Sequence, residues 1–529
     1  MIHGLDATFV HTTLVVGNAP VAAVDLLVVL GTAAIVATIF GRLKLETIPG
    51  YLLAGVLVGP GVLGLVREAE SIERMSGLAT VLLMFGIGLH LDVSEIRRGM
   101  VSILGIGLAS TLVFAGVSWP IGMLFGLSPP VALIAAMALS MSSTAVLIKV
   151  LQARRELKSI HGRLGIGISI MQDLLSVVAL AVVPLIATWA GVQSSGQGPN
   201  LASKLAEQLG GSGSMTLNLG LTAVLGLAGV SVILLAGKYV LPRLLEEVAK
   251  VASGELVLVL SAAIALGAGL GTAALGFSPE MGAFLAGFVL TFTPFRYQLS
   301  GQISPLRDIL MAVFFTVIGL KVIPGALVGD IPIIGLGLVM LVLVKFAVIA
   351  LSSWALGASG SVAVLAAAYT ANAGEFTLVV LAGAGKIVPP DVYGQLVAIV
   401  MLSLIATPLL VGPACKLAST LDPVKPPPWF KGVTSLDARH HGREHGEGAH
   451  AGAEGGPSQR VIIAGYGPIG RNVAERLKVL QVPHTVIDMN PRTVRRQADL
   501  GRDVIYGDVT NPDVLEQAGV RTSAAVVLT

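Results

Sequence analysis

Long apolar runs dominate this sequence and limit what it can fold into. A transmembrane helix needs about 20 mostly apolar residues, and thirteen stretches meet that requirement. A soluble protein could bury thirteen such runs only behind a polar exterior, but charged residues make up 12% of the chain, against about 25% in soluble proteins. The sequence therefore predicts a polytopic α-helical membrane protein. The thirteen predicted transmembrane helices are residues 23–40, 47–66, 76–92, 100–126, 129–152, 162–190, 216–243, 255–275, 279–295, 303–323, 328–357, 360–386 and 391–415.

The charged residues are unevenly distributed and divide the chain into parts. Residues 430–529 carry charge at close to a quarter of positions, as soluble domains do, whereas the preceding residues carry it at under a tenth. We expect a transmembrane domain over 1–420, a linker over 421–459 rich in Pro, Gly and His, and a soluble domain over 460–529. The linker histidines fit a flexible segment better than a metal site. The net charge of +3 is too small to indicate a nucleic-acid partner.

Basic residues in the short loops predict how the chain crosses the membrane. Lys and Arg gather in cytoplasmic loops. With the N-terminus outside, thirteen of them lie in predicted cytoplasmic loops and five in outer loops. This orientation places the soluble C-terminal domain in the cytoplasm.

Three ionisable residues, Asp173, Lys345 and Glu375, lie well inside predicted transmembrane helices. Such a group costs at least about 2.5 kcal/mol at the membrane centre and is a functional hypothesis by default. Asp173 is nearest the centre and stands beside Gln172, whose carboxamide could add an oxygen ligand, so this pair is the strongest candidate for a cation site. An electrostatic or structural role is an equal alternative for Lys345 and the favoured one for Glu375.

Two predicted helices are interrupted near their middles, at Ser140–Thr144 and Thr370–Gly374. Runs of Ser, Thr, Asn and Gly favour local side-chain bonding over continuous helix, although small residues also serve as packing surfaces. A shift of seven helices maps the first six onto the last six, with 216–243 as the connector. This inverted repeat is typical of secondary transporters, whose ion sites lie at broken helices near the midplane.

The soluble domain carries a dinucleotide-binding fingerprint. Gly465, Gly467 and Gly470 follow a predicted strand and open a helix, and Asp488 ends the next strand about twenty residues on. Such glycines permit a tight turn and close approach of a phosphate, and the acid binds ribose hydroxyls. The predicted order is strand 460–464, helix 468–480, strand 484–488, helix 491–500, strand 503–506, helix 511–518 and strand 524–528. Four strands make a partial Rossmann-like α/β domain, so we expect either a truncated domain or one that pairs with another chain.

Several short motifs, in this order and spacing, give the chain a family resemblance. It resembles the monovalent cation:proton antiporter-2 family, most closely the bacterial Kef-type potassium/proton antiporters with a C-terminal nucleotide-binding domain (RCK or TrkA-N). The motifs are Leu53–Pro60, Ser142–Val146, Gln172–Asp173, Gly282–Gly287, Phe314–Gly319, Gly374–Phe376 and, in the soluble domain, Gly507–Asp508.

The resemblance implies a sodium/proton-antiporter fold in the bacterial inner membrane, with a core bundle that moves against a dimerisation panel in a homodimer. Asp173 matches the family's ion-binding aspartate, Ser143 and Thr144 its unwound segment, and Lys345 a membrane-embedded lysine. It implies an adenine nucleotide, AMP or NAD(H), as a regulator at the fingerprint and Asp508. It also implies glutathione control and an ancillary regulatory subunit. No cofactor is expected for transport.

The expected activity is exchange of K⁺ for H⁺ through competition at the Asp173 carboxylate. Gln172 cannot titrate, and one titrating acid predicts electroneutral exchange. A Na⁺/H⁺ antiporter and a nucleotide-gated K⁺ channel stay open as alternatives. A membrane-anchored dinucleotide-dependent enzyme is less favoured, because the soluble domain has no catalytic constellation beyond the nucleotide site.

Overall fold

The computed structural model describes most of the chain. Half of the predicted helix 216–243 and most of the linker 421–459 lie outside the described residues. The residues not described are 1–20, 44, 67–68, 91–100, 158, 192–223, 225–227, 230, 234, 238, 252–253, 276, 294, 422 and 425–457.

The described residues contain eight helices long and apolar enough to cross a membrane, or nine if one bent pair counts as a single span. Shorter apolar helices at Thr47–Val58, Met75–Leu89 and Pro279–Leu290 coincide with further predicted segments. The chain is a multi-pass membrane protein. Every predicted transmembrane segment other than 216–243 overlaps a described helix, but thirteen crossings stay a prediction, because these three helices are short.

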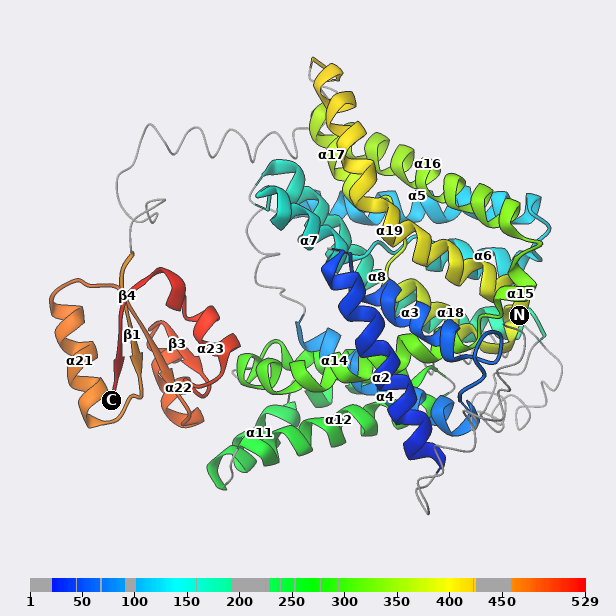
Figure 1. The fold of residues 1–529 in the computed structure, drawn as a ribbon. Coiled ribbons are helices and arrows are strands. Elements are labelled where there is room, and N and C mark those ends of the chain that lie inside the picture. Colours follow the sequence, from blue (N-terminus) through cyan, green and yellow to red (C-terminus); the bar gives the residue numbers. More distant parts are fainter. Residues whose placement is uncertain are drawn as a thin grey trace.

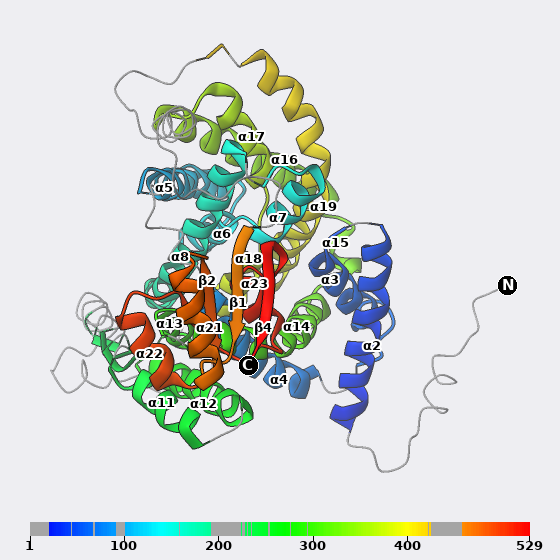
Figure 2. The same cartoon turned by 90° about the vertical axis from the view of Figure 1, so that its left-hand side faces the viewer.

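The transmembrane helices form two groups that pack more extensively within themselves than against each other (Figures 1 and 2). The panel group comprises α2 (Val21–Arg42), α3 (Thr47–Val58), α4 (Ala69–His90), α12 (Gly254–Ala274), α13 (Pro279–Leu290) and α14 (Arg296–Leu320). The core group comprises α5 (Val101–Leu124), α6 (Pro129–Leu139), α7 (Thr144–Arg154), α8 (Ile160–Trp189), α16 (Ile331–Ala355), α17 (Gly360–Thr370), α18 (Glu375–Ala384) and α19 (Pro390–Thr420). Short helices α11 (Leu241–Val251), α15 (Pro324–Leu327) and η2 (Gly385–Ile387) complete the described part of this region.

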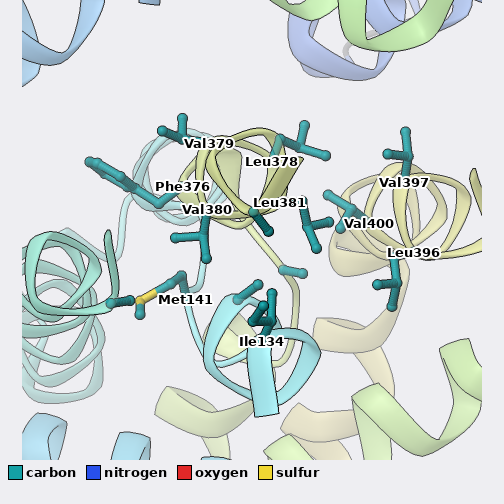
Figure 3. Packing of buried hydrophobic residues seen from close by; sticks show 14 of the residues in the cluster. Ile134, Met141, Phe376, Leu378, Val379, Val380, Leu381, Leu396, Val397 and Val400 are labelled. Atoms are coloured by element: carbon teal, nitrogen blue, oxygen red, sulfur yellow. The ribbon is translucent and has the colours of Figure 1, made fainter. Parts of the chain in front are cut away.

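Both predicted helix breaks are present, and they cross each other inside the core group. α6 ends at Leu139 and α7 begins at Thr144, and α17 and α18 are bent by 52°. The Gly374 amide donates to the Met141 carbonyl over 2.9 Å. An apolar cluster surrounds the crossing, and Figure 3 shows it joining Ile134 of α6 and Met141 of the break to side chains of α18 and α19.

The soluble domain is a four-stranded parallel sheet in the order β3-β2-β1-β4. Its helices and strands lie within two residues of the predicted boundaries, so the partial Rossmann-like domain is confirmed. Val461 pairs with His484 and Val486 with Val504. The elements are β1 (Ser458–Ala464), α21 (Pro468–Val479), β2 (His484–Asp488), α22 (Pro491–Asp499), β3 (Val504–Tyr506), α23 (Pro512–Gln517), η3 (Val520–Thr522) and β4 (Ser523–Leu528).

Candidate ion site and nucleotide site

Asp173 lies on α8, beside the start of α7, and its side chain is buried. One carboxylate oxygen, Oδ2, accepts a hydrogen bond from Thr144 Oγ1 over 2.9 Å. The other, Oδ1, has no hydrogen-bond partner within the described part of the chain. Buried polar atoms are nearly always paired, so each exception needs an explanation. An oxygen that is left free to bind a proton or a cation explains this exception.

Carboxamide and hydroxyl side chains hold the first break open. The Ser142 amide donates to Gln172 Oε1 over 2.9 Å, and the Ser143 amide donates to Asn372 Oδ1 over 2.8 Å. These two bonds satisfy backbone donors that a continuous helix would have paired internally. The oxygen of Gln172 is therefore engaged with the backbone, although the sequence suggested it as a cation ligand. Sequence reasoning missed Asn372, and its place in an interrupted helix was the available signal.

The charges of Glu375 and Lys345 match the half-helix ends that they contact. Glu375 is the first residue of α18 and accepts a hydrogen bond from Ser143 Oγ, the N-cap of α7, over 3.0 Å. Lys345 is fully buried on α16, and its Nζ donates to Leu139 O at the end of α6 over 2.8 Å and to Asn372 O over 2.6 Å. Helix N-termini carry partial positive charge and C-termini partial negative charge. Both positions suit compensation of helix dipoles, which is the structural alternative for these two residues.

A second polar cluster, which sequence reasoning missed, lies at the far end of α7. Glu156, in the loop between α7 and α8, accepts hydrogen bonds from Tyr369 Oη at 2.5 Å and Arg154 Nε at 3.2 Å, and its carboxylate lies 3.0 Å from His161 Nε2. Burial alone would raise the pKa of the Glu156 carboxyl, but these three contacts bring the pKa below its usual value. The cluster ties α7 and α8 to α17 just before its break.

The glycine turn of the soluble domain has the geometry that a nucleotide phosphate needs. Gly465 has φ +100°, a conformation that favours glycine, and a side chain at Gly470 would lie 2.1 Å from Gly465 O. Gly467 caps α21, and a side chain there would meet no atom within 4 Å, so the helix N-terminus is open. Asp488 accepts from the Tyr466 amide over 2.6 Å and from the Asn490 amide over 2.7 Å. Its remaining lone pairs suit ribose hydroxyls, so this turn fits a nucleotide.

Asp508 lies where the soluble domain meets the membrane part. Its amide donates to Gln298 Oε1 on α14 over 2.6 Å, and its carboxylate accepts from the Thr510 amide over 2.8 Å. The rings of Phe295 and Tyr506 pack edge to face beside this contact, 4.6 Å apart. The Gly507 amide donates to Asp488 O over 3.2 Å. A backbone hydrogen bond therefore joins Asp488, the candidate residue for binding ribose, to the segment that contacts α14.

Comparison with known families identifies the class of protein. Residues 30–417 match the family model "Sodium/hydrogen exchanger, transmembrane", and residues 461–529 match "TrkA-N domain". The chain belongs to the sodium/hydrogen exchanger family and carries a C-terminal TrkA-N domain. In fold it is similar to the sodium proton antiporter MjNhaP1 from Methanocaldococcus jannaschii, with a TM-score of 0.55, 18% identity, and coverage of 76% of this chain and 99% of that one. The predicted sodium/proton-antiporter fold is thus confirmed.

Curated relatives narrow the comparison further. The chain is 30% identical to K(+) efflux antiporter 1, chloroplastic, from Arabidopsis thaliana over 90% of its length, and it spans 38% of that relative. It is 28% identical to the glutathione-regulated potassium-efflux system protein KefC of Escherichia coli K12, over 95% of this chain and 74% of that protein. The resemblance to Kef-type antiporters drawn from the motifs is therefore confirmed.

Proposed function

We propose that the protein exchanges a monovalent cation, K⁺ rather than Na⁺, for H⁺ across the bacterial inner membrane. The observation that carries this proposal is the buried Asp173 carboxylate, one oxygen of which has no partner among the described residues, beside two crossed, broken helices. The names of the plant and E. coli relatives refer to potassium efflux, which favours K⁺. The plant relative is named an antiporter and not an enzyme, which counts against the membrane-anchored enzyme.

Exchange then follows from competition at one carboxylate. A proton and a cation each neutralise Asp173 but cannot occupy it together, so loading one expels the other. The residues around Asp173 hold the site in shape during the exchange. Thr144 orients the carboxylate, and the carboxamides of Gln172 and Asn372 keep the break open at Ser142 and Ser143. Glu375 and Lys345 balance the half-helix dipoles without binding the transported ion. A single titrating acid gives one proton per cation and electroneutral exchange. The N-terminus lies outside, and the functional unit is a homodimer.

The C-terminal domain regulates this exchange by binding AMP or NAD(H) at Gly465, Gly467, Gly470 and Asp488. The nucleotide supplies a phosphate for the open N-terminus of α21 and a ribose for Asp488. Asp508 also belongs to the nucleotide site, and its backbone amide passes the effect of binding to α14 through Gln298. We also propose an ancillary regulatory subunit.

The test is proton flux in proteoliposomes on addition of K⁺ or Na⁺, comparing wild type with Asp173→Asn. Asp308→Asn, which changes an exposed acid on α14, is the matched control. We expect saturable proton movement with K⁺ in wild type and the control, and none in Asp173→Asn. Substantial exchange by Asp173→Asn would refute the carboxylate mechanism. Cation flux without proton movement would favour the nucleotide-gated channel.

A further inference from the structure

One lysine bridges the two helix groups. Lys149 lies on α7 of the core group, and its Nζ is 3.3 Å from Glu46 Oε1. The same Nζ donates to Leu45 O over 2.7 Å. Leu45 and Glu46 form part of the loop between α2 and α3, in the panel group. Lys149 therefore holds both the backbone and a side chain of this loop.

The position of Lys149 links this contact to the candidate ion site. Lys149 lies five residues after Thr144, about 7.5 Å along the same half-helix. Thr144 is the residue that bonds Asp173. Any displacement of α7 that carries the ion site past the panel group must therefore pull Lys149 away from Glu46.

Among the described residues, the apolar contacts elsewhere between the two groups do not fix one arrangement in the same way. A buried apolar cluster spans the two groups and takes in Leu52 and Phe315 of the panel group together with Val400 of the core group. Apolar contact is non-directional, so such a surface tolerates sliding. An ion pair with an added backbone hydrogen bond has a defined geometry.

The ion pair is also accessible enough to open. The Lys149 side chain is 44% exposed and that of Glu46 is 15% exposed. Solvent screens such a pair, so its net strength is modest.

We infer that Lys149 and Glu46 form a gate between the core and panel groups, closed in this structure, which opens once in each exchange cycle. In the proposed orientation the gate lies on the cytoplasmic side. This inference rests on the proposed exchange function. Neither residue binds the transported ion in the closed state, and both act by setting the position of α7.

Cross-linking tests the gate directly. Glu46→Cys and Lys149→Cys are combined in a Cys415→Ser background, which removes the chain's one native cysteine, and joined with a short bifunctional thiol reagent that a reductant cleaves. We expect cross-linking to abolish cation-driven proton flux and the reductant to restore it. Each single-cysteine protein should have the same rate of exchange before and after the same treatment. Unchanged flux in a fully cross-linked protein would overturn the gate.

Charge reversal separates a gate from a merely structural contact. Glu46→Lys and Lys149→Glu should each change the maximal exchange rate, and the double variant should recover the wild-type rate. Equal K⁺ concentrations for half-maximal exchange in all four proteins would show that ion binding is intact. Failure of the double variant to recover the rate counts against the gate. A wild-type protein without exchange would instead refute the proposed function.

Discussion

The closest backbone approach at the crossed breaks gives a sharp prediction for Gly374→Ala. A Cβ at Gly374 would lie 2.6 Å from the Ser143 nitrogen and 2.7 Å from the Ser142 carbonyl carbon. These atoms belong to the backbone of the other break and cannot rotate away as a side-chain tip would. The backbone at Gly374, with φ −97°, is itself compatible with alanine, so the penalty is steric. Overpacking of this kind costs about 1–3 kcal/mol, and we expect a value at the upper end.

Gly335→Ala is the matched control, because it makes the same change on α16 where a Cβ meets no atom within 4 Å. We expect the melting temperature in detergent to fall for Gly374→Ala and to stay the same or rise for Gly335→Ala. Exchange in proteoliposomes should fall only for Gly374→Ala, since the shift separates the Gly374 amide from Met141 O. Wild-type melting and exchange in Gly374→Ala would refute the close crossing.

Three further predictions concern contacts elsewhere in the molecule. Lys345→Met leaves two buried carbonyls without their donor, and each unpaired carbonyl costs about 1–3 kcal/mol of stability. The melting temperature should therefore fall well below that of Gly335→Ala. An unchanged melting temperature would contradict the role of Lys345 at the helix ends. Glu156→Gln should lower the melting temperature at pH 7. Because the pKa of Glu156 is lowered, its carboxylate contributes fully to stability above pH 4.5 and less as the pH falls through the folded-state pKa. The difference in melting temperature between wild type and Glu156→Gln should therefore narrow below pH 4.5. A difference that stays constant with pH would contradict the lowered pKa of Glu156. Gln298→Ala removes the acceptor of the Asp508 amide. It should weaken the effect of AMP or NAD(H) on the exchange rate without changing the selectivity for K⁺ over Na⁺. Exchange in proteoliposomes with nucleotide inside measures both.

The sequence was most informative where local composition decides structure. The breaks at Ser140–Thr144 and Thr370–Gly374 were predictable, because such residues weaken a helix wherever they occur. The strands and glycine turn of the soluble domain were predictable from their periodicity. The contacts of Lys149 and Gln298 were not, because both join segments far apart in the chain and neither residue stands out by type or position. The number of membrane crossings could not be predicted from composition either, because an apolar run does not reveal where its helix ends.

The two acids near the crossing show why burial alone cannot identify an ion ligand. From the sequence, Asp173 and Glu375 are both carboxyls inside predicted membrane helices, and depth favours Asp173 only slightly. In the structure their surroundings differ. Glu375 begins α18 and bonds the N-cap of α7, so its charge serves two helix N-termini. Asp173 lies in the middle of α8, and only its Oδ2 faces the start of α7, through Thr144; its Oδ1 has no partner among the described residues. A buried carboxylate oxygen without a partner is costly to retain, and that cost is best explained if Asp173 binds the ions that the protein exchanges.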